Sequence, residues 1–272
     1  ETNSFGGSKI KLSKIGLDNK TYEINFAAAS NAKKATIGYN AYVLGSVGPT
    51  GVLPYPSGEG NFNLYFNSFY EQVKGLIDGG ADAIIIETMS SLLEAKAAYL
   101  AVKTFSDNIP IIISFTYTNN RTLYGTPPSV AAKTFNLLKA DVIGANCSGN
   151  AEDYKYIAEN YTANTNRPVC IMPNAGQPVI INNKISYKTT LEEFSRIIKT
   201  VIDCGASILG GCCGTNEIFI QEIKNIIKSK TFKPLSDLFN YNQITSDRYS
   251  ANLSELENAP ILLPDLDDLL DE

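Results

Sequence analysis

The stretch Gly79–Tyr117 reads GGADAIIIETMSSLLEAKAAYLAVKTFSDNIPIIISFTY and contains one full repeat of the fold. Two apolar runs within it, Ala83–Glu87 and Pro110–Tyr117, lack polar alternation, so we expect strands that are buried on both faces. Ser90–Thr104, between them, has the composition of a helix. Short connections from strand to helix to strand predict that the two strands are parallel neighbours in a sheet.

The same unit recurs along most of the chain. Further buried strands are predicted at Tyr42–Val47, Asp141–Asn146, Pro168–Met172 and Ala206–Gly210. Further helices are predicted at Asn19–Thr36, Asn63–Ile77, Ser129–Lys139, Ala151–Tyr161, Leu191–Cys204 and Asn216–Lys228. Glu1–Asn3 has the character of a strand end, which makes seven strands, and eight close a barrel. We therefore expect an α/β fold, a (β/α)8 TIM-type barrel, whose first strand is missing from this chain and lies upstream of Glu1.

The repeating pattern stops after Lys228. The sequence thus predicts a barrel over residues 1–228 and a C-terminal linker or acidic tail over 229–272. This tail ends in DLDDLLDE, and no chemistry is assigned to it.

The composition of the 272 residues excludes several classes of function. The net charge of −5 argues against a nucleic-acid partner, and no apolar run is long enough to suggest a membrane partner. The chain has no histidine, which rules out Ser-His and Cys-His catalysis and metal sites built on imidazole. Five cysteines, two of them adjacent, indicate free thiols in a reducing, cytoplasmic compartment.

In a βα-barrel, chemistry takes place where strands end, and three of the five cysteines fall there. Cys147 ends one predicted strand, and Cys212 and Cys213 follow another strand two units later. Three converging thiols suit zinc and leave one coordination position open, as catalytic zinc sites do. The alternative is that all three are small buried residues without a metal. A zinc ion held by three thiolates favours a substrate thiolate as nucleophile over activated water.

Polar groups at other strand ends are candidate ligands. Asn174 could supply an oxygen to the open metal position, or it could simply hydrogen-bond within its own turn. Glu87 ends an apolar strand and could receive a substrate ammonium group, with a capping or salt-bridged Glu as the alternative. The glycine-rich loops at Gly6-Gly7 and Gly45–Gly51 offer backbone N–H groups to a carboxylate.

Seven motifs together resemble the homocysteine S-methyltransferase family, most closely the homocysteine-binding domain of cobalamin-dependent methionine synthase. They are ETNSFGG (Glu1–Gly7), GSVGPTG (Gly45–Gly51), ETM with LLEAK (Glu87–Met89 and Leu92–Lys96), RTLYGTPP (Arg121–Pro128), GANCS (Gly144–Ser148), MPNAG (Met172–Gly176) and GGCCGT (Gly210–Thr215). The family's first strand, with its Asp-Gly pair, has no counterpart in the sequence.

The resemblance implies zinc on Cys147, Cys212 and Cys213, with the homocysteine sulfur as fourth ligand and Asn174 in its place without substrate. It also implies that Glu87 binds the homocysteine ammonium group. Backbone amides near Phe5 and Gly6 would bind the carboxylate, and Ser46 and Thr116 would line the mouth of the barrel.

The expected function is zinc-dependent methyl transfer to homocysteine, which yields methionine. The expected donor is methylcobalamin on another domain or chain, so cobalamin- and folate-binding domains or proteins are the expected partners. S-methylmethionine or betaine could instead donate the methyl group, and selenocysteine could accept it. The remaining alternatives are a non-catalytic zinc-binding barrel and a thiol redox protein using Cys212 and Cys213, which lack the C-x-x-C spacing.

Overall fold

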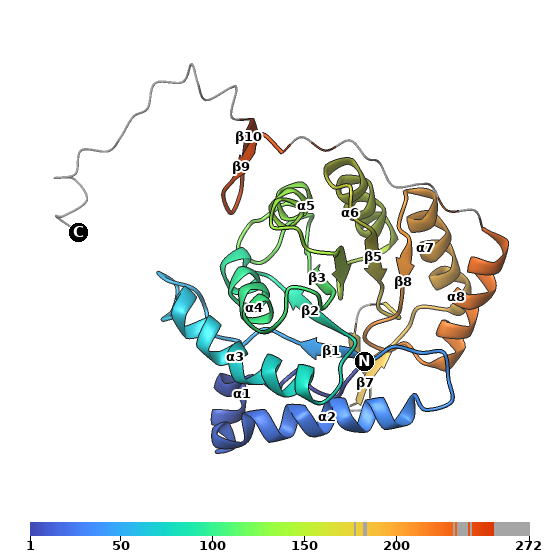
Figure 1. Cartoon of the computed structure of the whole chain (residues 1–272). Helices are drawn as coiled ribbons and strands as arrows, with labels where there is room; N and C mark the ends of the chain where they lie inside the picture. The colour runs from blue at the N-terminus through green and yellow to red at the C-terminus, as the bar shows by residue number, and fades with distance from the viewer. Residues whose placement is uncertain (177, 182–183, 231, 233–238, 240, 253–272) are drawn as a thin grey trace, which may run out of the picture.

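The computed structural model describes residues 1–252 apart from 177, 182–183, 231, 233–238 and 240. Six strands form one parallel sheet whose neighbours follow chain order (Figure 1). They are β1 (Leu44–Val47), β2 (Ala83–Met89), β3 (Ile111–Phe115), β4 (Val142–Asn146), β5 (Val169–Met172) and β8 (Ile208–Leu209). Every pairing in this sheet is parallel, as the sequence predicted.

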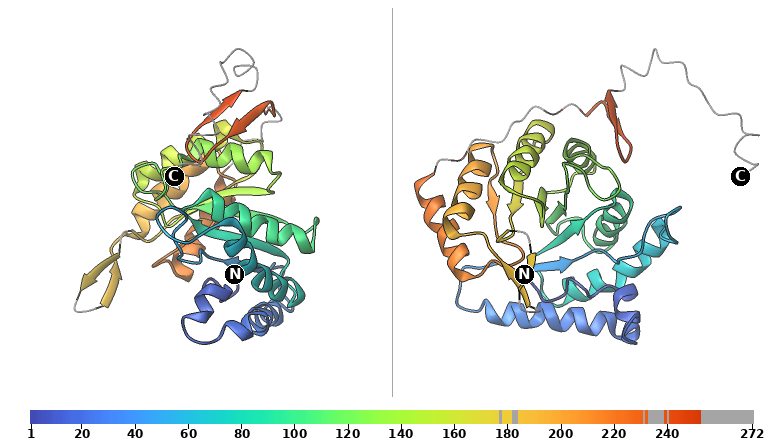
Figure 2. Two further views of the ribbon diagram at one scale, coloured as in Figure 1. Left: turned by 90° about the vertical axis from the view of Figure 1, so that its left-hand side faces the viewer. Right: turned by 180° about the vertical axis from the view of Figure 1, so that it is seen from behind.

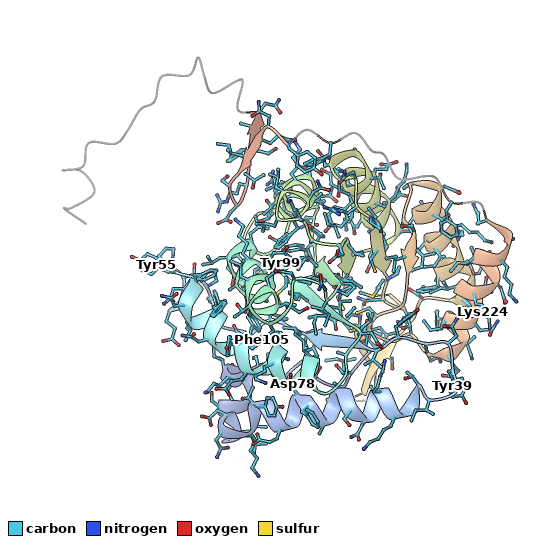
Figure 3. The ribbon with its side chains drawn as sticks, viewed as in Figure 1. Tyr39, Tyr55, Asp78, Tyr99, Phe105 and Lys224 are labelled. Carbon is cyan, nitrogen blue, oxygen red and sulfur yellow. The ribbon has the colours of Figure 1, made fainter. Side chains whose placement is uncertain are left out.

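Helices surround the sheet on its outer side (Figure 1). They are α1 (Lys9–Ser13), the 3-10 helix Asp18–Lys20, α2 (Thr21–Ala35), α3 (Phe62–Asp78), α4 (Leu92–Phe105), α5 (Pro128–Leu137), α6 (Ala151–Asn164), α7 (Leu191–Asp203) and α8 (Glu217–Ser229). The seven predicted helices are confirmed within a few residues, whereas α1 was not predicted. Side chains fill the layer between strands and helices, and Tyr99 of α4 donates its hydroxyl to the Leu138 carbonyl beside α5 (Figure 3).

Successive residues of a strand pack into two different apolar clusters, one on each side of the sheet. Ile84 and Ile86 of β2 belong to the large cluster between the sheet and the helices, while Ile85 faces a small interior cluster. That interior cluster also contains Ile112, Val142, Cys170 and Met172. Because side chains alternate across a strand, continuous apolar runs supply both faces at once.

Three of the helix-to-strand turns, those after α3, α5 and α7, each have one residue in the left-handed region. Gly80 (φ 96°), Lys139 (φ 63°) and Gly205 (φ 108°) end α3, α5 and α7 in this way. A left-handed residue terminates a helix and turns the chain directly into the next strand, and glycine adopts that conformation without strain. The short αβ turns inferred from the sequence are therefore confirmed.

The chain start lies along the outer edge of β1. Thr2 donates its amide to the Leu44 carbonyl at 2.9 Å and accepts the Ser46 amide on its hydroxyl at 2.9 Å. Within the described residues no strand pairing joins β8 to β1, so the barrel has an open seam there. The TIM-type α/β fold is confirmed, and an additional upstream strand stays a prediction.

Two hairpins do not correspond to any predicted element. The first, β6 (Pro178–Ile181) with β7 (Lys184–Tyr187), lies between β5 and α7 and projects from the body (Figure 2). The second, β9 (Gln243–Thr245) with β10 (Ser250–Asn252), packs on α5 through the Thr134 and Thr245 hydroxyls, 2.9 Å apart. It lies inside the segment predicted as a tail, whose acidic end, 253–272, falls outside the described residues.

Candidate metal and substrate site

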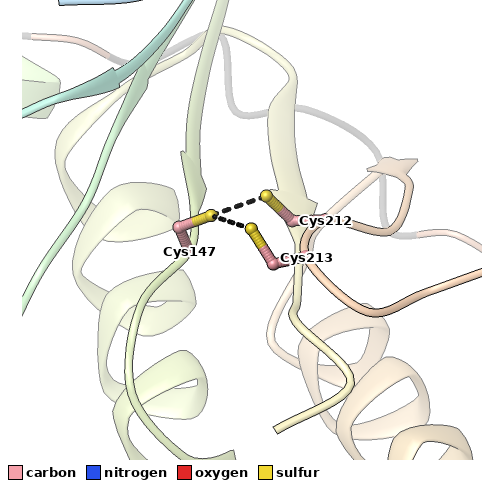
Figure 4. Close-up of side chains that lie close together, drawn as sticks. All are labelled: Cys147, Cys212 and Cys213. Atoms are coloured by element: carbon pink, nitrogen blue, oxygen red, sulfur yellow. Dashed lines mark hydrogen bonds between the residues drawn. The ribbon is translucent and has the colours of Figure 1, made fainter. Parts of the chain in front are cut away.

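The structure brings Cys147, Cys212 and Cys213 together at the carboxyl ends of β4 and β8 (Figure 4). The Cys147 Sγ lies 2.7 Å from the Cys212 Sγ and 3.5 Å from the Cys213 Sγ. All three are free thiols, with Cys213 exposed and the other two half-buried. Cys170 lies in the barrel interior and Cys204 at the end of α7, so neither contributes to this group.

Local backbone geometry directs the three sulfurs inward. Cys147 is in the left-handed region (φ 49°), which costs on the order of 1–3 kcal/mol for a residue with a Cβ. On the other side, the Thr215 amide and hydroxyl both donate to the Cys212 carbonyl and close a tight turn. Gly214 (φ 78°) completes this turn, and a Cβ there would overlap the Tyr187 ring of β7.

The donor set fits a zinc ion. The three Sγ atoms lie within 4.8 Å of one another, and three sulfurs at about 2.3 Å from one tetrahedral zinc are roughly 3.8 Å apart. Asn174 lies beside them, because Cys212 donates its amide to the Pro173 carbonyl and Ala175 donates to the Cys213 carbonyl, both at 2.9 Å. The buried Asn174 Oδ1 has no hydrogen-bond partner among the described residues. An orphaned oxygen beside three thiols is the arrangement expected of a fourth ligand, and metal binding itself stays a prediction.

The thiols also differ in how readily they ionise. The hydrogen bond from Cys147 lowers the pKa of Cys212, and a second from the Asn146 side chain lowers it further. The same contact with Cys212, together with burial, raises the pKa of Cys147. Cys212 is therefore the first of the pair to become a thiolate, the form that binds metals.

Glu87 lies near the end of β2 and is 7% exposed. Burial is the main reason its pKa is raised to about 7; the Ser46 hydroxyl, which donates to Glu87 Oε1 at 2.5 Å, opposes this shift. No salt bridge to Glu87 occurs in the described part of the chain, so the salt-bridged alternative is not supported. A substrate cation would favour the ionised form of this carboxyl group.

The loop Ser4–Gly7 presents unpaired backbone donors beside β1. Among the described residues, the amides of Phe5 and Gly6 donate no hydrogen bond, while the Phe5 carbonyl accepts the Gly48 amide at 3.1 Å. Two fully buried amide side chains hold this loop from behind. Gln72 of α3 donates to the Ser4 carbonyl at 2.8 Å, and Asn25 of α2 donates to the Gly7 carbonyl at 2.8 Å.

Thr116 follows β3 and reaches the cysteine group through the backbone, since its hydroxyl donates to the Cys147 carbonyl at 2.9 Å. Ser46 is connected to Glu87 on one side and to Thr2 on the other. Both side chains therefore have hydrogen-bond partners within the protein, and contact of either with substrate stays a prediction.

Asn146 and Tyr187 were not assigned a role from the sequence. Asn146 was noted only as the neighbour of Cys147, although a fully buried amide at a strand end signals a local polar network. Tyr187 lies in the unpredicted hairpin β6–β7 and packs on the turn after Cys213. Only the three-dimensional arrangement reveals that contact.

Comparison with known proteins identifies the family of this chain. The model of the family described as homocysteine S-methyltransferase matches residues 1–227. The methionine synthases of Mycobacterium leprae and Mycobacterium tuberculosis are each 30% identical over 234 residues, which is 82% of this chain. The chain spans only about a fifth of these relatives, 19% and 20% of their lengths.

Solved structures share the fold. The homocysteine methyltransferase MmuM from Escherichia coli, in its oxidized form, superposes with a TM-score of 0.68 at 21% identity, covering 83% of this chain and 78% of that one. Its metallated form superposes with a TM-score of 0.66 at 20% identity and the same coverage. From the family match over most of its length, the chain belongs to the homocysteine S-methyltransferase family.

Proposed function

We propose that this chain catalyses zinc-dependent methyl transfer to the sulfur of homocysteine, a step of methionine biosynthesis. The observation that carries the proposal is the group of three free thiols, Cys147, Cys212 and Cys213, with all Sγ atoms within 4.8 Å at two strand ends. The family match over residues 1–227 supports homocysteine as the methyl acceptor. We propose residues 1–228 as the unit that carries this activity.

Cys147, Cys212 and Cys213 would hold the metal, and Asn174 would complete the set when homocysteine is absent. A bound zinc ion supplies a positive charge that keeps an incoming thiol deprotonated near neutral pH. This takes the place of a histidine base, a residue type that the sequence does not contain. The sulfur then forms a bond to the methyl carbon, and the donor keeps the electron pair of the bond that breaks.

The amino-acid part of homocysteine would lie between β1, β2 and the Ser4–Gly7 loop. Glu87 would bind its ammonium group, oriented by the Ser46 hydroxyl. The unpaired amides of Phe5 and Gly6 would bind its carboxylate. Thr116 would support the cysteine side through its bond to the Cys147 carbonyl.

We propose methylcobalamin as the methyl donor, with cobalamin- and folate-binding domains or proteins as partners. The two methionine synthases support this assignment because they are much longer than the matched region. S-methylmethionine or betaine is the second candidate donor. The description of the matching family names homocysteine but no methyl donor, so it is compatible with this alternative as well.

The test is a purified, zinc-analysed sample incubated with homocysteine and each donor in turn, with methionine as the product measured. We expect about one zinc per chain and methionine formation with methylcobalamin. Methionine formed only from S-methylmethionine or betaine would replace the proposed donor. Zinc retained without methionine from any donor would leave a non-catalytic zinc-binding barrel, and a folded protein that binds no zinc would overturn the proposal.

A further inference from the structure

Asn146 is the last residue of β4 and lies between the two halves of the site. It is fully buried, and both atoms of its side-chain amide are saturated with partners. Its Oδ1 accepts from the Thr88 amide at 3.0 Å and from the Ser114 hydroxyl at 2.7 Å. Its Nδ2 donates to the Thr88 hydroxyl at 2.7 Å and to the Cys212 Sγ at 3.5 Å.

The contact with Thr88 holds a strained backbone in place. Thr88 has φ 59°, in the left-handed region, which a β-branched residue rarely adopts. Asn146 binds both the amide and the hydroxyl of this residue, so it fixes the conformation from two sides. Thr88 directly follows Glu87, and its conformation determines how the end of β2 presents the Glu87 carboxyl group.

The contact with Cys212 provides a hydrogen-bond donor to sulfur. The Nδ2 group of Asn146 points a hydrogen at the Cys212 Sγ, 3.5 Å away, and an N–H donor in this position stabilises negative charge on a sulfur atom. Asn146 also directly precedes Cys147, which is itself left-handed. One side chain therefore contacts the Cys212 thiol, which lies beyond the end of β8, and the backbone that follows Glu87 on β2.

We propose that Asn146 is a positioning residue that couples the metal-binding thiols to the substrate-binding carboxylate. Its amide orients Cys212 and tunes the charge on that sulfur, while the same amide locks Thr88 and thereby aims Glu87. This inference rests on the proposed function, since it assumes that the thiols hold a metal and that Glu87 binds homocysteine. Neighbours of metal ligands commonly have this role, and their loss changes metal affinity or activity by about 10–100-fold.

Two substitutions distinguish the contact of Asn146 with Cys212 from its contact with Thr88. Asn146→Asp keeps an oxygen for the Thr88 amide and the Ser114 hydroxyl, and its second oxygen can accept a hydrogen bond from the Thr88 hydroxyl, but it removes the N–H that faces Cys212. Thr88→Val removes the hydroxyl that Asn146 binds and leaves the contact with Cys212 unchanged. Ser114→Ala is the matched control, because it deletes one bond to the same Asn146 oxygen without affecting Thr88 or sulfur.

The first readout is the thiolate-to-metal absorption of cobalt-substituted protein without homocysteine. We expect a shift to longer wavelength in N146D, because a sulfur without its N–H donor releases electron density to the metal more easily. T88V and S114A should keep the wild-type band. The second readout is homocysteine KM against kcat, for which T88V should raise KM roughly 2–10-fold, the effect of one lost hydrogen bond, with kcat and zinc content retained.

The wild-type protein separates failure of this inference from failure of the proposed function. If cobalt-substituted wild type shows no change on addition of homocysteine, the proposed function fails. If wild type responds and N146D has the same band as wild type, Asn146 does not act on the sulfur. If T88V gives the same homocysteine KM as wild type, the contact between Asn146 and Thr88 does not position Glu87, and this result stands even if N146D does not fold.

Discussion

The two halves of the site are built in different ways. The thiol half is set mainly by backbone, since Cys147 directly follows β4, Cys212 and Cys213 lie in the turn that follows β8, and Thr215 closes this turn. The amino-acid half depends on side chains from other elements. Gln72 and Asn25 hold the Ser4–Gly7 loop, and Ser46 orients Glu87. We therefore expect that changes in the amino-acid half can abolish homocysteine binding while zinc binding is retained. Changes in the thiol half should abolish both.

The largest expected effect comes from breaking the thiol half. Cys147→Ser or Cys212→Ser removes one of three thiolates. We expect the zinc content to fall from about one ion per chain to a small fraction of that value, with loss of methionine formation. Zinc analysis by atomic emission after dialysis measures this. Cys204→Ser, at the end of α7, is the matched control and should retain zinc; equal zinc in all three variants would contradict the account.

The pH dependence of protein stability tests the amino-acid half of the site, which contains Glu87. An unfolded Glu releases its proton near pH 4.5, whereas folded Glu87 releases it at about 7, so the folded state holds the extra proton between these values. The free energy of unfolding of metal-free protein should therefore decline as pH rises through this window, by up to about 3 kcal/mol. Glu87→Gln should lose this component and be more stable than wild type at pH 8. The free energies of unfolding of the two proteins are measured by urea denaturation from pH 5 to 8. If both change with pH to the same extent, the burial of Glu87 is contradicted.

The same substitution should weaken substrate binding. A charged hydrogen bond contributes about 1.5–3 kcal/mol, so Glu87→Gln should raise the homocysteine dissociation constant by roughly 10–100-fold with zinc retained. Isothermal titration with homocysteine measures the change. Unchanged affinity in a zinc-loaded variant would remove Glu87 from the site.

The smallest expected effect comes from the loop support. Gln72→Leu removes the donor to the Ser4 carbonyl, and we expect homocysteine KM to rise about fivefold, the effect of about 1 kcal/mol, while zinc content and kcat stay close to wild type. Steady-state kinetics at saturating donor give both parameters. A fall in zinc content would show that the two halves are not separable in the way described here.

The sequence was most informative where one physical rule acts alone. Apolar runs without polar alternation predicted all six strands, and the rule that chemistry lies at strand ends predicted that Cys147 would meet Cys212 and Cys213. The same rule pointed to Asn174 as a metal ligand; its oxygen is buried and has no partner among the described residues, and its role as a ligand stays a prediction.

Features that depend on contacts between distant segments were not predictable. The strands of the hairpins β6–β7 and β9–β10 are short and lie outside the repeating strand–helix unit, which is the pattern that identified the equally short strands of the sheet. The role of Asn146 depends on Thr88 and Cys212, which are 58 and 66 positions away. Nothing in the residues around Asn146 indicates those partners.

X-ray absorption at the zinc edge tests the central claim most directly, because it counts the sulfur atoms bound to the metal. The account predicts three sulfurs and one oxygen or nitrogen in the zinc-loaded protein, and four sulfurs after homocysteine is added. A sulfur count that stays the same when homocysteine binds would contradict it.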